Sequence, residues 1–321
     1  SGLIKGDSDS AIIFSSALAS GFSHTITNQA GGIIQTGSST APAILTAADD
    51  VTINTSGTID GSSSGEAITM GSGNNALNIL GGSAAIIGDV TGGSGSNSLV
   101  VDPGVGNTFS YSGRITNFSS AQVESGTFNL SGMLSAGQTT VTGGALAGSG
   151  TLNGLVAVDA GGLISPGNGV GKITLQSGLS LSAGGEYLWQ LGTLTDDSNG
   201  IAGVDFDQIA LTGGNLTLGG SSELTLDFSA LGTSDPNSAD PFWQSEHSWT
   251  IIDGSGASNT GDTNFFEIAD PSFADGSFMT STDANGNAVL TYQVVPEPTS
   301  LTAVLASLGL LGLVRRRKRV G

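Results

Sequence analysis

Residues 26–34 read ITNQAGGII and residues 53–59 read INTSGTI, so one phrase of apolar and polar residues around a Gly returns along the chain. Further short apolar runs stand between Gly, Ser, Asn and Asp at residues 77–80, 84–87 and 99–101. Such runs are too short for a helix and suit β-strands. We therefore expect an all-β protein in this part of the chain.

The spacing of these phrases favours a solenoid. They return irregularly, about every 20 to 27 residues, which suits one coil of short strands and Gly-rich corners per repeat. Gly and Asn supply the positive φ angles or close backbone approaches that tight corners need. A β-sandwich with many turns is the alternative, and we favour the parallel β-helix because hairpin signals do not dominate.

The charge of the chain is unevenly distributed. Five of the eight basic residues lie at positions 315–319, whereas all 27 acids lie upstream, so residues 1–314 carry three bases against 27 acids, a net charge of −24. A surface without a basic stripe repels nucleic acid, and we expect no nucleic-acid partner. The chain has no Cys, which excludes disulfides, Cys-ligated metals and a thiol nucleophile.

A denser pattern follows at residues 143–186. It includes GGALAGSGTL at 143–152, VAVDAGGLISPGNG at 156–169 and GKITL at 171–175. This stretch resembles the autotransporter-associated β-strand repeat of surface-protein passenger regions. The resemblance implies a right-handed parallel β-helix, in agreement with the periodicity upstream. We predict a solenoid domain over residues 1–186.

The composition changes after Gly185, where all three Trp and most aromatic residues occur. Strand-like segments remain, and Leu224–Phe228 alternates between apolar and polar residues. We predict a β-rich acidic cap at residues 187–294, which covers the end of the solenoid. We expect Trp243, Trp249, Phe265 and Phe266 to form its core.

The C-terminal residues 295–321 combine three elements. Pro296, Glu297 and Pro298 are followed by the uncharged segment 301–314 and then by the basic cluster Arg315, Arg316, Arg317, Lys318 and Arg319. With residues 299 and 300 the uncharged segment spans roughly 24 Å as a helix, slightly short of a hydrocarbon core of about 30 Å. We predict a single transmembrane helix, with the cluster on the cytoplasmic side.

This tail closely resembles the PEP-CTERM sorting signal of Gram-negative bacteria. The resemblance implies recognition of Pro296-Glu297-Pro298 by an exosortase-type processing enzyme, a transient membrane anchor, and then a cell-surface or extracellular location with exopolysaccharide or biofilm. An ordinary C-terminal anchor is the alternative. Because residues 1–10 show no charged-then-apolar signal segment, we also expect the chain to lack its start.

Candidate metal ligands lie in the predicted cap. Asp205 and Asp207 are two residues apart and would share one face of a strand, and Asp196 and Asp197 are near in sequence. These four carboxylates are our candidates for a Ca²⁺ site, with an exposed acidic segment as the alternative. The Gly-rich segments 71–77 and 92–99 resemble calcium β-roll turns, but Asn stands where the ligand Asp belongs, which favours a structural role.

The sequence contains no catalytic constellation that we recognise, so we predict a protein that is not an enzyme and has no cofactor apart from the candidate Ca²⁺. The adjacent Asp49 and Asp50 would point to opposite faces of a strand. Our leading hypothesis is an exported structural protein of the cell surface or matrix. An autotransporter-like adhesin and a polysaccharide-degrading β-helix enzyme are the alternatives.

Overall fold

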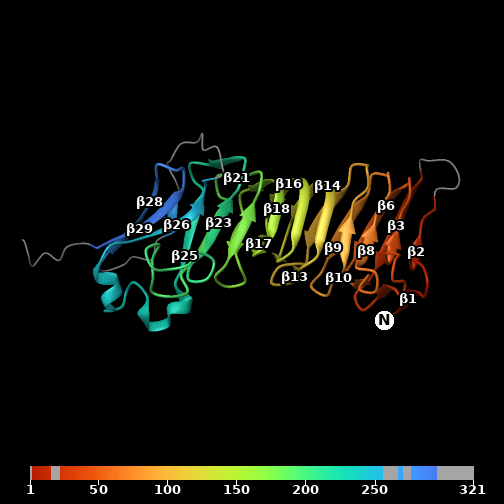
Figure 1. Ribbon diagram of the computed structural model, residues 1–321, viewed down its shortest axis with the longest axis horizontal. Helices are drawn as coiled ribbons and strands as arrows, with labels where there is room; N and C mark the ends of the chain where they lie inside the picture. The colour runs from red at the N-terminus through yellow and green to blue at the C-terminus, as the bar shows by residue number, and fades with distance from the viewer. Residues whose placement is uncertain (1, 16–21, 256–266, 270–275, 295–321) are drawn as a thin grey trace, which may run out of the picture.

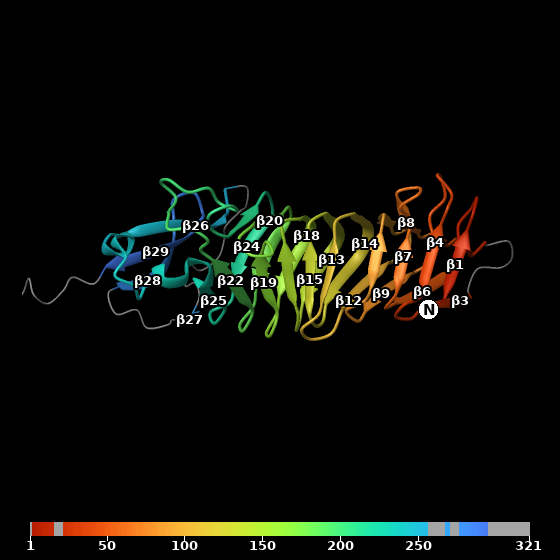
Figure 2. The same ribbon diagram turned by 90° about the horizontal axis from the view of Figure 1, so that it is seen from below.

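The computed structural model of the 321-residue chain is an elongated stack of β-coils, which run from the N-terminal end to the C-terminal end along the long axis (Figure 1). The structure describes residues 2–15, 22–255, 267–269 and 276–294. Successive coils lie side by side in both views (Figures 1 and 2), so residues far apart in the sequence become neighbours one coil apart.

One side of the stack is a series of parallel strands, one from each coil. It begins with β1 (Leu3–Gly6), β4 (Ile33–Thr36), β7 (Thr58–Asp60) and β10 (Ala85–Ile87). It continues as a second parallel sheet with β13 (Thr108–Tyr111), β15 (Thr127–Leu130), β17 (Ala145–Gly148), β19 (Leu163–Pro166), β22 (Glu186–Gln190), β25 (Glu223–Asp227) and β27 (Glu267–Ala269).

The remaining strands form two more rows within one large sheet. The first row holds β2 (Ile12–Ile13), β5 (Ile44–Leu45), β8 (Glu66–Thr69), β11 (Asp89–Thr91), β20 (Lys172–Leu175), β23 (Gln208–Leu211) and β26 (His247–Asp253). The second holds β3 (Ser23–Asn28), β6 (Asp50–Thr55), β9 (Ala76–Leu80), β12 (Ser98–Asp102), β21 (Gly178–Leu181) and β24 (Asn215–Leu218). In the middle coils the long strands β14 (Arg114–Val123), β16 (Met133–Val141) and β18 (Thr151–Val158) join both rows.

In-register pairing stacks equivalent side chains in the core. Ile26 lies opposite Ile53, Ile53 opposite Leu77, and Leu77 opposite Leu99 on the next coil, and all four are buried. Each coil cannot bury its apolar residues alone, so stacking the coils creates one continuous core. The parallel ladders confirm the predicted all-β solenoid and not the sandwich; its right-handedness stays a prediction.

Coil length varies along the stack, which explains the irregular spacing in the sequence. Leu3 lies opposite Ile33, a step of 30 residues (33 − 3), whereas Thr127 lies opposite Ala145, a step of 18 (145 − 127). The coils pack closely enough to require Gly at some contacts. A Cβ atom on Gly93 would collide with the carbonyl oxygen of Gly71 on the preceding coil.

The C-terminal end departs from parallel pairing. There β26 and β28 (Gly276–Thr282) pair antiparallel on either side of β29 (Ala288–Val294), while the 3₁₀ segments η1 (Ser229–Ser234) and η2 (Pro241–Gln244) lie beside them. Trp189, Trp243 and Trp249 are all buried here, and the indole rings of Trp189 and Trp249 are 5.5 Å apart. Aromatic side chains thus fill the last coils, as the composition suggested.

The boundary between residues 186 and 187 stays a prediction, and the parallel ladder runs through it, since β22 pairs with β19 and β25 with β22. The burial of Trp243 and Trp249 agrees with the expected cap core, while Phe265 and Phe266 lie outside the described residues.

Within the described residues we find no helix of the length and apolarity that a membrane crossing needs. The predicted span 301–314 lies outside them.

Candidate functional site

Rows of outward side chains, which we call the outer ladder, follow the face built by β3, β6, β9 and their successors. In-register pairing places the first row in line, from Thr27, Asn54, Asn78, Val100 and Gln122 to Thr140, Ala157, Ser180 and Thr217. The second row is Thr25, Thr52, Ala76, Ser98, Ser120, Gln138 and Leu155. Neighbours in a row are about 4.8 Å apart, the spacing of paired strands.

Most members of the outer ladder carry hydroxyl or amide groups, four are apolar (Val100, Ala157, Ala76 and Leu155, with Ala157 buried), and none is charged. One pair of neighbours in the first row is hydrogen-bonded, with Asn78 Nδ2 donating to Asn54 Oδ1 across 2.8 Å. Charged groups flank the two rows on the same strands, since Asp50 of β6 and Asp102 of β12 lie at outward positions. The opposite side of the stack carries Lys5, Asp60 and Glu186 at its outward positions. The outer ladder is therefore a repeating, uncharged hydrogen-bonding surface on an otherwise acidic protein.

Charge also varies along the stack. Residues 103–172 hold two acids, Glu124 and Asp159, and two bases, Arg114 and Lys172. Of the 27 acids in the chain, ten precede residue 160 and one is Glu297, which leaves 16 in residues 173–294, a stretch without Lys or Arg. The solenoid thus has a neutral middle and a strongly acidic C-terminal end.

The structure does not gather the four predicted calcium ligands into one site. Asp196 accepts a hydrogen bond from the His247 ring, and Asp197 accepts two from Thr250, at 2.8 and 2.7 Å. Asp205 accepts from Thr193 and from the backbone of Ile201. In the described part of the chain no group of three or more His, Cys, Asp or Glu is placed to hold a metal ion, so the Ca²⁺ site stays a prediction without a geometric counterpart.

Asp207 is the fourth candidate, and it lies inside the solenoid with no exposed surface. Its carboxyl group accepts hydrogen bonds from the backbone of Gly171 at 2.7 Å and of Gln190 at 3.1 Å, so it joins two neighbouring coils. Burial raises the pKa of Asp207 to about 8, although both hydrogen bonds favour the ionised form and oppose the rise. This carboxyl group therefore links neighbouring coils of the solenoid.

The Gly-rich turns that resemble calcium β-rolls are closed by Asn side chains. Asn97 is buried, and its Nδ2 donates to the carbonyl oxygens of Gly93, Gly95 and Asn117, each at 3.1 Å. This agrees with the structural role expected from Asn at the ligand position.

The adjacent Asp49 and Asp50 have separate partners. Asp49 lies 3.4 Å from His24, and Asp50 accepts a hydrogen bond from the backbone N–H of Asn74.

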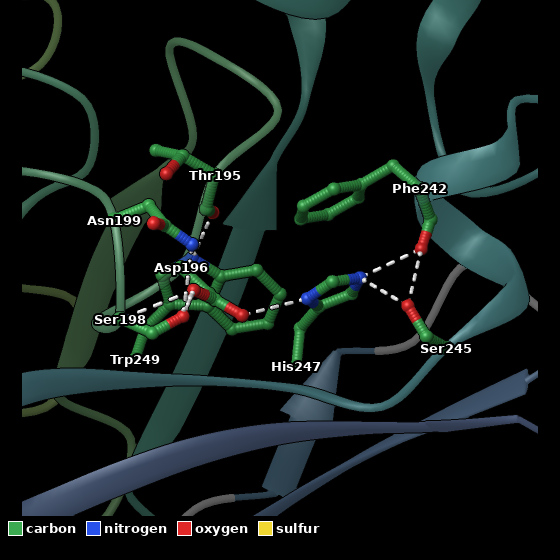
Figure 3. A network of polar contacts seen from close by, with 8 residues as sticks. All are labelled: Thr195, Asp196, Ser198, Asn199, Phe242, Ser245, His247 and Trp249. Carbon is green, nitrogen blue, oxygen red and sulfur yellow. Dashed lines mark hydrogen bonds and ion pairs between the residues drawn. The ribbon is translucent and has the colours of Figure 1, made fainter.

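A polar network around His247 was not predicted from the sequence (Figure 3). His247 Nδ1 lies 2.8 Å from Asp196 Oδ2, and its Nε2 lies 2.6 Å from the carbonyl oxygen of Phe242 and 3.1 Å from Ser245 Oγ. The imidazole ring stacks on Phe242, with centroids 3.6 Å apart and planes within 3°. The side chains of His247 and Asp196 are only 10% and 18% exposed.

The network has the connectivity of a Ser–His–Asp triad, but the contacts at Nε2 differ from those of a catalytic His. A catalytic His must accept the serine proton at Nε2. Here the Phe242 carbonyl oxygen, which only accepts, is closer to Nε2 than Ser245 is, and Ser245 Oγ is itself within 3.3 Å of that carbonyl oxygen. Nε2 therefore donates to Phe242, and the ring is not arranged to take a proton from Ser245.

Hydrogen bonds also lower the pKa of Asp196. Burial raises the pKa of Asp196, but the bonds from His247 and Ser198 outweigh burial and hold it below its ordinary value. The carboxyl group of Asp196 therefore stays ionised to lower pH than an ordinary Asp. The sequence gives little indication that these two residues meet, because Asp196 and His247 are 51 residues apart. The one unusual feature is that His247 lies in a stretch without Lys or Arg.

The described structure ends at Val294, the last residue of β29, and the predicted sorting residues lie beyond it. Residues 294–319 match the PEP-CTERM protein-sorting motif, which includes Pro296, Glu297, Pro298 and the cluster from Arg315 to Arg319. The prediction of this motif is confirmed. No curated protein matches the chain, and the resemblance of residues 143–186 to the autotransporter-associated repeat stays a prediction.

Proposed function

We propose that this protein is an exported scaffold of the cell surface or extracellular matrix, and that its outer ladder contacts neutral polysaccharide. The sorting motif at residues 294–319 indicates a protein that is exported through exosortase sorting. The protein associates with a membrane while it is processed. The motif begins where β29 ends, so the sorting signal follows directly on the last strand of the cap. The solenoid is then the part delivered outside.

The outer ladder is the observation that carries the proposal. A polysaccharide presents hydroxyl groups at regular intervals, and donors and acceptors repeated about every 4.8 Å meet such a chain along its length. Thr, Asn and Gln side chains act as both donors and acceptors. The absence of charge on the ladder and the neutral balance of residues 103–172 favour a neutral polymer over an anionic one.

Replacing ladder residues tests this proposal. The variant combines Asn54→Ala, Asn78→Ala, Gln122→Ala and Thr140→Ala, which removes four polar side chains in line. The matched control combines Ser110→Ala and Asn129→Ala on the opposite side, where Asn129 Nδ2 lies 3.4 Å from Ser110 Oγ in an equivalent pair. Both proteins are tested against immobilised neutral and anionic polysaccharides.

We expect the full chain to bind a neutral polysaccharide, the ladder variant to lose at least tenfold in affinity, and the control variant to retain it. Equal binding by both variants would contradict the role of the ladder. Failure of the full chain to bind any polysaccharide selectively would contradict the proposed contact altogether.

A further inference from the structure

The N-terminal end of the solenoid is open, since no coil lies beyond the first one among the described residues (Figures 1 and 2). β1 pairs with β4, β2 with β5 and β3 with β6, and in the described structure none of the three has a second strand beside it. The carbonyl oxygens of Gly2 and Gly6 accept from the next coil, so the alternate residues Leu3 and Lys5 direct their backbone groups to the free edge. Such an edge is a template for pairing with another strand.

Side chains at core positions are exposed at this end. Ile4 lies in register with Ile34, and Ile34 with Ile59, so the three form one inward row. Ile4 is 50% exposed, whereas Ile34 and Ile59 are 2% and 0% exposed because a coil covers each of them. The first coil therefore ends in an apolar surface of the kind that the next coils bury.

The three strands of the first coil also enclose an open hollow of about 300 Å³. Ile4 of β1, Ile12 of β2 and Ile26 of β3 line it, one from each strand. Ile13 of β2 and Phe22, directly before β3, are 45% and 61% exposed. Because the removal of apolar surface from water is favourable, this end favours contact with a partner surface that is itself apolar.

The distribution of charge decides which surface of a second copy fits this end. Residues 1–48 contain one Lys, no Arg and two Asp, and Lys5 pairs with Asp7 at 3.0 Å. Residues 173–294 contain 16 acids and neither Lys nor Arg. A head-to-tail contact would therefore bring the acidic C-terminal end against a surface without excess positive charge. Two nearly neutral N-terminal ends repel each other only weakly.

A two-fold axis makes two N-terminal ends complementary to each other. It brings β1 of each copy together in opposite directions, and antiparallel strands exchange N–H···O=C hydrogen bonds directly. The C-terminal end shows that the parallel sheet accepts an antiparallel strand, because β29 pairs antiparallel with β26, which itself continues a parallel row.

We propose that two copies of this chain associate head to head through their N-terminal ends. β1 of one copy pairs antiparallel with β1 of the other, and the Ile4 and Ile13 side chains of both copies are buried between the two first coils. The result is one solenoid of double length with an acidic cap at each end. Because the contact uses the same surface of both copies, it closes on itself, and we expect a dimer and no fibre.

Sedimentation velocity of the full chain over a range of concentrations tests the association. The test variant combines Ile4→Asp and Ile13→Asp, which add charge at side chains that are already exposed. The matched control combines Val105→Asp with Val204→Asp in the loop 192–207 between β22 and β23, where the side chains are 90% and 65% exposed. We expect the control to dimerise like the unchanged chain and the test variant to show a dissociation constant at least tenfold larger. A monomeric full chain, or equal association of both variants, as contact through residues 301–314 would give, would overturn the proposal.

A single cysteine in β1 tests the orientation, because the chain has no Cys of its own. In Ile4→Cys a head-to-head contact brings the two thiols within reach of a short bis-maleimide, and Val105→Cys is the matched control. We expect the cross-linked dimer to form at least tenfold faster in Ile4→Cys than in Val105→Cys. Equal rates would overturn the head-to-head contact.

Hydrogen exchange distinguishes a second copy from any other cover of this end. We expect the backbone amides of Leu3 and Lys5 to be protected in the dimer and to lose that protection when Ile4→Asp and Ile13→Asp are combined. Protection of these amides in a monomeric protein would show that another part of the polypeptide covers the end, and it would overturn the proposal.

Discussion

Asn75 and Asn97 lie one coil apart inside the solenoid, and Asn75 Nδ2 donates a hydrogen bond to Asn97 Oδ1 across 2.9 Å. The Nδ2 group of Asn97 in turn donates hydrogen bonds to three backbone carbonyl oxygens. Those of Gly93 and Gly95 belong to its own coil, and that of Asn117 belongs to the next coil. Buried polar groups are stabilising only when they are fully hydrogen-bonded. This pair therefore fixes the conformation of two Gly-rich turns that have no apolar side chains to hold them.

Removing the Asn97 amide is expected to destabilise the protein. Asn97→Ala removes a buried amide and leaves three partly buried carbonyl oxygens without this donor, which lowers the free energy of unfolding by roughly 2–4 kcal/mol. Asn97→Asp replaces the donors with acceptors and costs more, and added Ca²⁺ does not restore the loss. Urea unfolding followed by circular dichroism measures both effects, with Asn78→Ala as the half-buried control that costs less than about 1 kcal/mol.

The close approach of two coils gives a second prediction. Gly93→Ala places a methyl group against the Gly71 carbonyl oxygen, so the two coils must separate, and we expect a loss of more than about 3 kcal/mol or failure to fold. Gly220 is a matched control, because no atom lies within 4 Å of the Cβ position there. Gly220→Ala should change stability by less than about 0.5 kcal/mol, and equal effects of the two changes would contradict the packing of these coils.

The buried carboxyl group of Asp207 predicts a dependence of stability on pH. Its pKa is about 8 in the folded protein and near 3.8 in an unfolded chain, so the folded state holds the proton more tightly. The stabilisation is complete below the lower value and falls by about 1.4 kcal/mol per pH unit as pH rises toward 8. The free energy of unfolding, measured at several pH values between 4 and 8, reports this slope.

Asp207→Asn should remove that slope, since Asn keeps an acceptor oxygen for the Gly171 N–H and does not ionise. Asp159→Asn serves as control, because Asp159 is half-buried and accepts a hydrogen bond from the Ser182 hydroxyl. A slope that survives in Asp207→Asn, or disappears in Asp159→Asn, would show that another group is responsible.

The solenoid was predictable because its signals are local. Each coil repeats short apolar runs and Gly-rich corners, and those alone specify strands that must stack to bury one face. The sorting motif was predictable for the same reason, since Pro296-Glu297-Pro298, the apolar segment and the basic cluster follow one another in the chain. Neither inference requires knowledge of which residues meet in space.

The polar network around His247 and the buried carboxyl group of Asp207 depend on contacts between coils, and these were not predictable from the sequence. Asp196, Asp197, Asp205 and Asp207 look alike in the sequence, yet the coil register exposes some and buries Asp207 completely. The loop 192–207 contacts His247, which lies 51 residues after Asp196. No periodicity in the sequence predicts that contact. The burial of one acid and the pairing of another are tertiary properties.

The central claim is that residues 294–319 direct this solenoid to the outside of the cell. Its most direct test compares the location of the full chain with that of a chain ending at Val294, together with mass spectrometry of the C-terminus of the mature protein. We predict that the full chain reaches the surface or medium without Arg315–Arg319 and that the shortened chain does not reach the same place. Equal delivery of both chains, or a mature protein that keeps the arginine cluster, would contradict the account.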